Sequence, residues 1–552
     1  MLKKFAATIR DKKSLIIELG LFFVILLTFI INSSYVSYPD EFVNLLGGVF
    51  IGHGKLPYVH FFDHHLPLPW YLASLFLKFS FQSFILFRLY WAFFTFLLLA
   101  ILALWIRKNH KPIYPYYLGF FVMYPLVAVY FWLHLYLSDS LAALFFSLVF
   151  WILLVETLNN KSRFKIILIA SLATFCLIFS SLTFLYVGLV LYLWQVYLLK
   201  FNLKKIVIFC LFSVIPYLIY LLYLFLTGSF YDFYFANFVY NTELYISIPN
   251  YTRGRLFNPL KFALTLIYNF WSNFLPVLAM LKDFNLYLPI ATLMALGSLI
   301  FLLLLVSTNV FVASLFFLLL SFSAPRSNIK ITNEADYQIG LYLMLGLISS
   351  FVALYLLRKL RIKDVLINDL RRIGQFFITI LIFFSFIFLL KNTYDKWYLR
   401  YTQKMPSIQN SAPIAQFIDD ILDKEDYYWL GPYEPHEEFF VKKAQLPGKY
   451  STLLPQFKEN DYLKKGFIDQ FKKNPPSIIV FKKDTGIYLT PAYQFGDFFL
   501  EWMKDKYTPL AEIKNITLLK SPTNLKLMTH VYLLNSKKAA ILSKLKEKGY
   551  IE

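Results

Sequence analysis

Long apolar runs alternate with short polar segments over the first 390 residues of the chain. Most of these runs are about 20 residues long, which is the length that an α-helix needs to cross a hydrocarbon core of about 30 Å. The run over residues 164–199 is too long for one crossing, and the polar residues Ser180, Ser181 and Thr183 divide it into two. We therefore predict a polytopic α-helical membrane protein, with crossings near residues 15–35, 81–106, 113–133, 138–156, 164–199 (two crossings), 206–226, 286–306, 310–322, 339–357 and 376–390.

The positively charged residues lie mostly between the apolar runs, and they set the orientation. Lys3, Lys4 and Arg10 precede the first run, so the positive-inside rule puts the N-terminus in the cytoplasm. The run over residues 262–281 is interrupted by polar residues and a proline, and counting it as a crossing would put the cations of residues 358–372 outside. We predict that this run is interfacial or re-entrant. About eleven crossings remain, with a cytoplasmic N-terminus and an extracytoplasmic C-terminus.

The composition becomes more polar after Leu390, which predicts a membrane domain over residues 1–390 and a second domain over residues 391–552. Ser411, followed by Ala412 and Pro413, is typical of the N-cap of a helix, and we expect this helix to run through Leu422. Short β-prone runs and helical patterns predict the remaining elements. The strands are expected over residues 427–430, 477–481 and 531–534, and the helices over residues 497–506 and 538–548. The second domain is therefore predicted to be a small extracytoplasmic α/β domain.

The composition supports the membrane assignment. Hydrophobic residues make up 58% of the chain and charged residues only 16%, whereas a soluble protein carries about 25% charged residues. The net charge of +21 could indicate nucleic-acid binding, but the cations cluster between apolar runs, so membrane topology explains them better. The two cysteines, Cys176 and Cys210, both lie in apolar runs and indicate neither a disulfide framework nor a metal site.

The polar stretch over residues 38–70 stands out between the first two apolar runs. It contains two glycine-containing turns and four of the eight histidines of the chain, His53, His60, His64 and His65. The acidic pair Asp40 and Glu41 opens it. A carboxylate just outside a membrane helix can act as a general base, bind a metal or simply end the helix in water. Adjacent acids point in different directions, so we expect the two to have different roles.

Asp63 stands beside His64 and His65. Histidine and aspartate can bind a divalent metal, and a protonated imidazole can bind a phosphate. Adjacent histidines lack the usual helical spacing of metal ligands, so a metal stays an open alternative rather than a prediction. Histidines that are simply hydrogen-bonded at the membrane interface are the third interpretation.

Three further ionisable residues are expected on the same outer side. Asp139 begins the fourth predicted crossing, where it could cap the helix or face an outer cavity. Arg326 and Lys330 lie in an outer loop, where the positive-inside rule disfavours cations. An anionic ligand would explain them, since arginine binds phosphate oxygens in a bidentate manner, and acidic lipid headgroups are the alternative.

The order of these features resembles the GT-C superfamily of integral membrane glycosyltransferases, in particular the protein O-mannosyltransferase and aminoarabinose transferase group. The resemblance rests on Asp40-Glu41 after the first helix, on Gly54-Lys55-Leu56-Pro57-Tyr58, and on the string over residues 62–68, FDHHLPL. The turn over residues 138–140 and the outer loop that contains Arg326 also look like the family. One departure is that His65-Leu66-Pro67 stands where relatives have Lys-Pro-Pro, and the late outer loop lacks the His-Tyr pair of many relatives.

The resemblance implies an inverting transfer of a sugar from a polyprenyl-phosphate donor to a cell-envelope acceptor at the outer face of the cytoplasmic membrane. Asp40 would be the general base, with Glu41 as the second catalytic carboxylate. Asp63, His64, His65, Asp139, Arg326 and Lys330 would bind substrate. No cofactor is implied with certainty, and a divalent metal stays open. The alternatives are a non-enzymatic lipid or glycan transporter and an O-antigen-ligase-like transferase. The sugar and the acceptor cannot be read from the sequence.

Overall fold

The computed structural model describes residues 2–160, 162–245, 258–279, 289–326, 336–360, 365–402, 410–513 and 529–552. The chain forms two compact units, each made of segments that are far apart in the sequence. Unit 1 contains Met1–Ser37, Ile85–Ile219 and Pro259–Ile408, and unit 2 contains Tyr38–Phe84, Tyr220–Asn258 and Gln409–Glu552.

Unit 1 is helical. Among the described residues, eight helical segments are long and apolar enough to cross a membrane, and three shorter apolar helices accompany them. The predicted crossings all correspond to these helices, so the prediction of a polytopic α-helical membrane protein is confirmed. The helices are α1 (Leu2–Ser33), α4 (Phe84–Asn109), η1 (Lys111–Ile113), α5 (Tyr114–Tyr130), α6 (Ser138–Leu158), α7 (Phe164–Ser180), η2 (Leu182–Phe184), α8 (Leu185–Leu198), α9 (Leu203–Leu226), α11 (Pro259–Ala279), α12 (Pro289–Thr308), α13 (Val310–Phe322), η6 (Tyr337–Ile339), α14 (Gly340–Lys359) and α15 (Val365–Tyr401).

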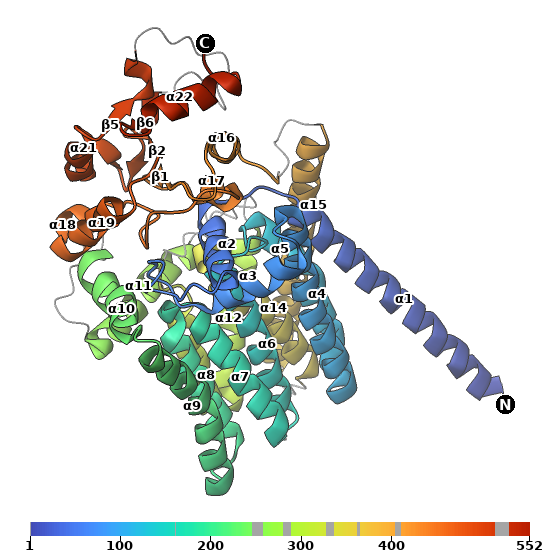
Figure 1. Cartoon of the computed structure of the whole chain (residues 1–552). Helices are drawn as coiled ribbons and strands as arrows, with labels where there is room; N and C mark the ends of the chain where they lie inside the picture. Colours follow the sequence, from blue (N-terminus) through green and yellow to red (C-terminus); the bar gives the residue numbers. More distant parts are fainter. Residues whose placement is uncertain are drawn as a thin grey trace. The chain divides into compact units, whose positions relative to one another are not determined.

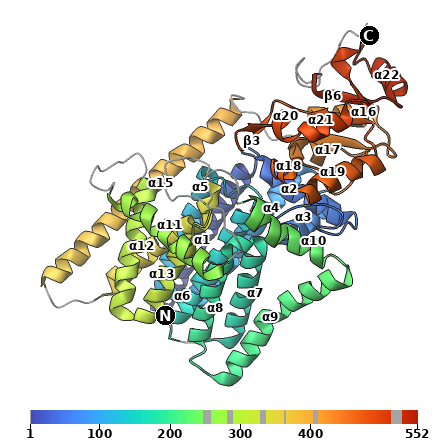
Figure 2. The ribbon, with the colours of Figure 1, turned by 90° about the vertical axis from the view of Figure 1, so that its left-hand side faces the viewer.

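Close helix packing in unit 1 depends on small residues. Helices α12 and α14 lie side by side (Figure 1), and a Cβ atom added at Gly297 would lie 2.7 Å from the Cα atom of Ser350. A side chain at Gly346 would likewise collide with Met294. Such residues let backbones approach closely where lipid gives no hydrophobic drive for association. Helices α6, α7 and α8 form a second group of neighbours (Figure 2).

Two buried cations of unit 1 neutralise the carbonyl ends of helices. The Arg88 guanidinium, which is fully buried, donates to the carbonyl oxygens of Ser33 (3.3 Å) and Val36 (3.0 Å) at the end of α1. The Lys396 ammonium donates to the carbonyl oxygen of Val129 (3.2 Å) in the last turn of α5. The C-terminal end of a helix carries unpaired carbonyls and partial negative charge, so both cations stabilise these ends.

Unit 2 contains two helices from the polar stretch, a short aromatic segment and an α/β region. The elements are α2 (Pro39–Gly52), α3 (Leu68–Phe79), α10 (Phe230–Tyr234), the π-helix η3 (Phe235–Leu244), α16 (Pro413–Ile421), β1 (Tyr428–Gly431), α17 (Pro435–Phe440), α18 (Gln456–Glu459), α19 (Asp461–Lys473), β2 (Ile478–Phe481), β3 (Gly486–Ile487), β4 (Thr490–Pro491), α20 (Ala492–Phe495), α21 (Asp497–Met503), β5 (Tyr507–Pro509), η7 (Leu510–Glu512), β6 (Val531–Leu534) and α22 (Lys538–Glu547).

The main sheet of unit 2 has the order β1-β2-β6-β5, with β1 and β2 parallel and the other pairs antiparallel. Alternate residues point to opposite faces of a strand. Leu430 and Val480 therefore share one core with helices α16 and α22, while Trp429 and Ile479 share the other core with α19 and α21. The predicted α/β fold of the C-terminal region is confirmed, because the three expected strands all lie in this sheet.

Two local predictions are wrong. Ser411 does not cap the first helix of this region, because Ala412 holds the N-cap position without a side-chain bond. Glu437 takes over the role, accepting hydrogen bonds from the backbone N–H groups of Ile414 (3.0 Å) and Ala415 (3.1 Å). The first expected glycine turn is also absent from the described structure, because its glycines at positions 47 and 48 lie inside α2.

Candidate active site

The acidic pair of the polar stretch stands in the first turn of α2. Tyr38 precedes this helix in an extended conformation and Pro39 begins it, which suits proline at the first helical position. Two acids here are favourable, because the N-terminal end of a helix carries partial positive charge. Asp40 is half-buried, and its Oδ1 atom accepts a hydrogen bond from the Tyr433 hydroxyl at 2.8 Å. Glu41 is fully buried, so the two carboxylates have different environments.

Glycines join α2 closely to α3. A Cβ atom added at Gly47 would lie 2.5 Å from the Trp70 ring, and one at Gly48 would lie 2.7 Å from the Cβ atom of Ala73. Trp70 is fully buried, and its ring meets those of Tyr58 and Phe61 at centroid distances of 5.6 and 5.2 Å. The connection between α2 and α3 is therefore anchored by aromatic residues on the inner side of this helix pair.

This connection holds the Asp63-His64-His65 turn. The Oδ1 atom of Asp63 accepts from the backbone N–H of His65 at 3.0 Å and lies 2.7 Å from the His65 Nδ1 atom. The His64 Nδ1 atom is 3.8 Å from the same oxygen. Burial raises the pKa of the Asp63 carboxyl, but the two imidazoles and the backbone hydrogen bond outweigh it and lower the pKa below its usual value. Asp63 is thus held as a carboxylate.

The same three residues could hold a divalent metal. They offer one carboxylate oxygen and two imidazole nitrogens within 4.8 Å of one another, a ligand set that suits Zn²⁺. The short contact between Asp63 and His65 joins two of these groups. Metal binding would therefore replace that contact. The structure therefore keeps both uses of the turn open, as a metal site and as a charged hydrogen-bonding group.

Aromatic side chains surround His64. Its ring centroid is 4.1 Å from that of His65, 4.8 Å from that of Tyr245 and 5.3 Å from that of Tyr240. Both tyrosines belong to the segment around the π-helix η3, and Asn241 of this helix donates to the His64 carbonyl oxygen at 3.0 Å. Single π-helical turns occur frequently at functional sites. The sequence analysis did not single out these tyrosines, although the aromatic density of the segment over residues 230–245 was a signal.

The C-terminal segment contributes residues that no motif marked. Tyr433 binds Asp40, and the Lys449 ammonium forms an ion pair with Asp232 at 2.7 Å. The carbonyl oxygen of Lys449 also accepts from the backbone N–H of Phe62 at 2.8 Å, directly beside Asp63. Unit 2 thus combines five of the predicted site residues with partners from three separate segments.

Two other predicted site residues pair in unit 1. Arg326 donates to Asp139 Oδ2 at 3.1 Å and to the hydroxyl of Ser181 at 2.6 Å. Asp139 is only 2% exposed and does not cap α6, because the N-cap position is Leu137. Ser181 belongs to the polar break between α7 and α8. Its hydroxyl therefore has Arg326 as a partner. Lys330 lies outside the described residues.

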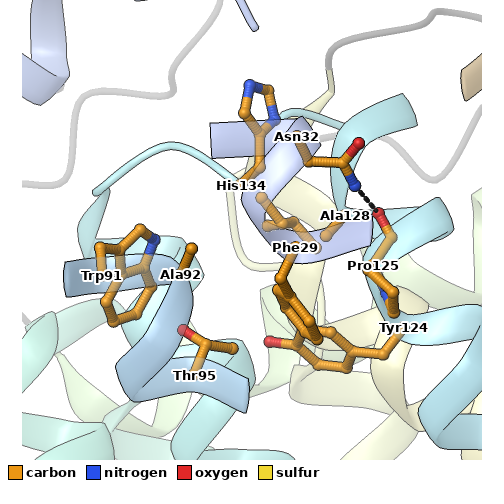
Figure 3. A pocket seen from close by; sticks show the side chains of 10 residues that line it. Phe29, Asn32, Trp91, Ala92, Thr95, Tyr124, Pro125, Ala128 and His134 are labelled. Atoms are coloured by element: carbon orange, nitrogen blue, oxygen red, sulfur yellow. Dashed lines mark hydrogen bonds between the residues drawn. The ribbon is translucent and has the colours of Figure 1, made fainter. Parts of the chain in front are cut away.

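Unit 1 contains a cavity whose lining includes none of the predicted site residues. It lies between α1, α4 and α5 and is lined mainly by aromatic and aliphatic side chains (Figure 3). Asn32 at its rim donates to the carbonyl oxygen of Pro125 at 2.9 Å. His134 also lines the cavity, and burial together with the nearby charges of Arg88 and Lys396 lowers the pKa of this imidazole well below its ordinary value.

Comparisons with known proteins give a likeness to solved structures but none to known sequences. No protein-family model and no curated protein matches the sequence. Among solved structures, the chain is similar to ArnT from Cupriavidus metallidurans, in a crystal structure with undecaprenyl phosphate bound. The two chains share 13% sequence identity with a TM-score of 0.49, and the match covers 95% of this chain and 98% of that chain. We base the function proposed below on the residues of this chain.

Proposed function

We propose that this protein is an inverting membrane glycosyltransferase that moves a sugar from a polyprenyl-phosphate donor to a cell-envelope acceptor. The acceptor is a glycan, a lipid or a protein, and the reaction takes place on the outer face of the cytoplasmic membrane. The observation that carries the proposal is the setting of Asp40. It is a half-buried carboxylate at the start of the helix that follows the first apolar helix in the sequence. It accepts a hydrogen bond from Tyr433 and belongs to the same unit as the Asp63-His64-His65 turn.

Asp40 acts as the general base. Its carboxylate takes the proton from an acceptor hydroxyl or amine as that group attacks the anomeric carbon. The bond from the anomeric carbon to the phosphate oxygen breaks, and polyprenyl phosphate leaves with the electron pair. A single displacement of this kind inverts the anomeric centre. The Tyr433 hydroxyl orients the carboxylate by holding its Oδ1 atom at 2.8 Å. Glu41, which is fully buried in the same turn, is proposed as the second carboxylate of the site.

The leaving phosphate requires cationic partners. Within unit 2, Asp63 lies 2.7 Å from the Nδ1 atom of His65 and orients this imidazole. In its protonated form the ring donates through Nε2 to the phosphate. If Asp63, His64 and His65 hold a divalent metal, that ion supplies Lewis-acid stabilisation of the phosphate oxygens. We also assign Arg326 and Lys330 to donor binding, since cations suit a phosphate, and Asp139 to holding Arg326 through their ion pair at 3.1 Å.

A donor screen tests the proposal. The purified full-length protein is mixed with synthetic polyprenyl-phosphate sugars and candidate acceptors, with and without a chelator, and the release of polyprenyl phosphate is measured. We expect at least one donor to be turned over by the wild type. Asp40→Asn should abolish transfer, because the amide cannot accept the proton, while insertion into the membrane and the melting temperature are kept.

Asp497→Asn is the matched control. Asp497 is an exposed acid of the same unit that pairs with Lys458 at 2.5 Å, outside the candidate site. Its loss should leave turnover unchanged. Full activity of the Asp40→Asn variant would refute the role of this residue. Passage of donor lipid across a vesicle membrane, without cleavage of the sugar-phosphate bond, would identify a transporter instead.

A further inference from the structure

The hairpin formed by β3 and β4 has an unfavourable turn. Gly486 pairs with Pro491 and Ile487 pairs with Thr490, so Tyr488 and Leu489 form a two-residue loop. Both loop residues have positive φ angles, 49° and 65°. A turn with two positive φ angles strongly favours asparagine and glycine, because side chains with a bulky Cβ substituent are strained there. This hairpin therefore keeps two large residues where small ones would be more stable.

Packing within the hairpin does not explain these residues. The Leu489 side chain is completely exposed, and 41% of Tyr488 is exposed. Leu489 gains no hydrophobic stabilisation from the strained geometry, and the hairpin itself offers little to Tyr488, which is only partly buried. Strain that is kept without a packing benefit is found mostly at functional sites, so the surroundings of the Tyr488 ring indicate its role.

The Tyr488 ring faces the candidate active site. It meets the ring of Tyr245 edge to face, at a centroid distance of 6.2 Å. Tyr245 in turn lies against His64 at 4.8 Å, with the ring planes 34° apart. Burial, the neighbouring tyrosines and the Asp40 carboxylate together raise the pKa of the Tyr488 hydroxyl, which shows that this side chain lies within electrostatic range of Asp40.

These contacts form a continuous row of rings, Tyr488, Tyr245 and His64, that extends from the neighbourhood of Asp40 to the Asp63-His65 pair. Flat rings with an exposed face are suited to the apolar C–H face of a sugar, while the carboxylates and imidazoles beside them suit its hydroxyl groups. A lipid tail would need no such polar neighbours.

We propose that the β3–β4 hairpin is a sugar-recognition element, and that its strained turn holds Tyr488 as one end of an aromatic wall against which the transferred sugar ring stacks. This inference rests on the function proposed above, because it takes the sugar of the polyprenyl-phosphate donor as the ligand. Tyr488 determines which sugars bind, and it takes no part in the proton transfer.

The test separates sugar binding from turnover. The melting temperature of the full-length protein is measured with a polyprenyl-phosphate sugar and with polyprenyl phosphate that lacks the sugar. The difference between the two shifts reports the sugar contribution. Tyr488→Ala should weaken the sugar-dependent part of the affinity about 3- to 10-fold, the worth of one aromatic contact, and should leave binding of the bare lipid phosphate unchanged. Tyr488→Phe should retain both.

The double variant Y488N/L489G tests the strain. It should raise the melting temperature without ligand by about 2 °C or more, because both turn residues become favourable, yet weaken sugar binding as Tyr488→Ala does. L489G alone keeps the tyrosine and should retain wild-type sugar binding. If the sugar-dependent affinity were unchanged in both Tyr488→Ala and Y488N/L489G, the inference would be overturned. Turnover by the wild type would still support the transferase. Sugar-dependent binding that needs Tyr488, in a protein that transfers no sugar, would retain the recognition element and overturn the transferase.

Discussion

The packing of α2 on α3 can be tested by the substitution Gly48→Ala. The added Cβ atom would lie 2.7 Å from the Cβ atom of Ala73 and 2.8 Å from the backbone nitrogen of Ser74. Ordinary contacts begin at 3.4 Å, so the two helices must separate by about 0.7 Å, and the backbone nitrogen cannot rotate away as a flexible side chain would. Overpacking of this kind costs about 1–3 kcal/mol. The gain in helix propensity from glycine to alanine, about 1 kcal/mol, offsets part of it.

The functional effect should exceed the effect on stability. Asp40 stands on the first turn of α2, and an error of about 1 Å in the position of a catalytic group can lower the rate about 100-fold. We expect Gly48→Ala to lower kcat at least tenfold, to lower the melting temperature by a few degrees, and to leave membrane insertion intact. The assay is sugar transfer by the purified protein, combined with a thermal melt of the same sample.

Gly52→Ala is the control on the same helix. At this position the nearest atom to an added Cβ is the flexible Ser74 hydroxyl oxygen, at 3.4 Å. This variant should retain wild-type kcat and melting temperature. If Gly48→Ala behaved in the same way as Gly52→Ala, the close approach of α2 to α3 would not position the Asp40 carboxylate, and the prediction would be refuted.

Two further predictions concern buried charges. Arg326→Met leaves the carboxylate of Asp139 buried without its guanidinium partner, which should cost about 3–5 kcal/mol, and the double variant that adds Asp139→Asn should recover part of the lost melting temperature. Glu438 is buried in α17, and burial together with the charge of Glu434 raises the pKa of its carboxyl well above the usual value. The folded state therefore binds this proton more tightly than the unfolded state, so the stabilisation is complete below pH 4.5 and is lost as the pH rises through the folded pKa. Glu438→Gln should remove this loss, and melts at pH 5 and pH 8 should show a benefit of the glutamine that grows with pH. A benefit that is equal at both pH values would refute the assignment.

The elements that the sequence predicts correctly are those determined by local patterns. A crossing helix needs only a long apolar run, so the helices of unit 1 are found at the expected positions. Helix α15 extends from Val365 to Tyr401, well beyond the apolar run over residues 376–390, because helical hydrogen bonding continues through polar residues. Helix α19 was missed, although Asn460 caps it by accepting from the backbone N–H of Leu463 at 3.0 Å. Leu463 and Phe467 at helical spacing were the available signal.

The site itself is predictable only in part. Asp40 and Asp63 could be chosen because they are charged in a stretch flanked by apolar runs. Tyr433 could not, since it lies 393 residues from Asp40 and has no motif around it. Strand β5, Tyr507–Pro509, was missed for a related reason, because three residues ending in proline give no strand pattern without their partner β6. Long-range partners of this kind depend on the fold and not on their sequence neighbours.

The assembly of unit 2 from distant segments affects how the protein is made. The ribosome adds about 5–20 residues per second, so about 20–80 s pass between the synthesis of Asp40 and that of Tyr433. During this interval Phe42 on α2 lacks His436 and Phe440, whose rings later lie 4.6 and 6.0 Å from it. We expect a nascent chain that stops in this interval to insert its first helices normally and to remain inert. Under the proposed function, completion of the last segment would act as a checkpoint in biogenesis, since the Asp40 carboxylate acquires Tyr433 only late in translation.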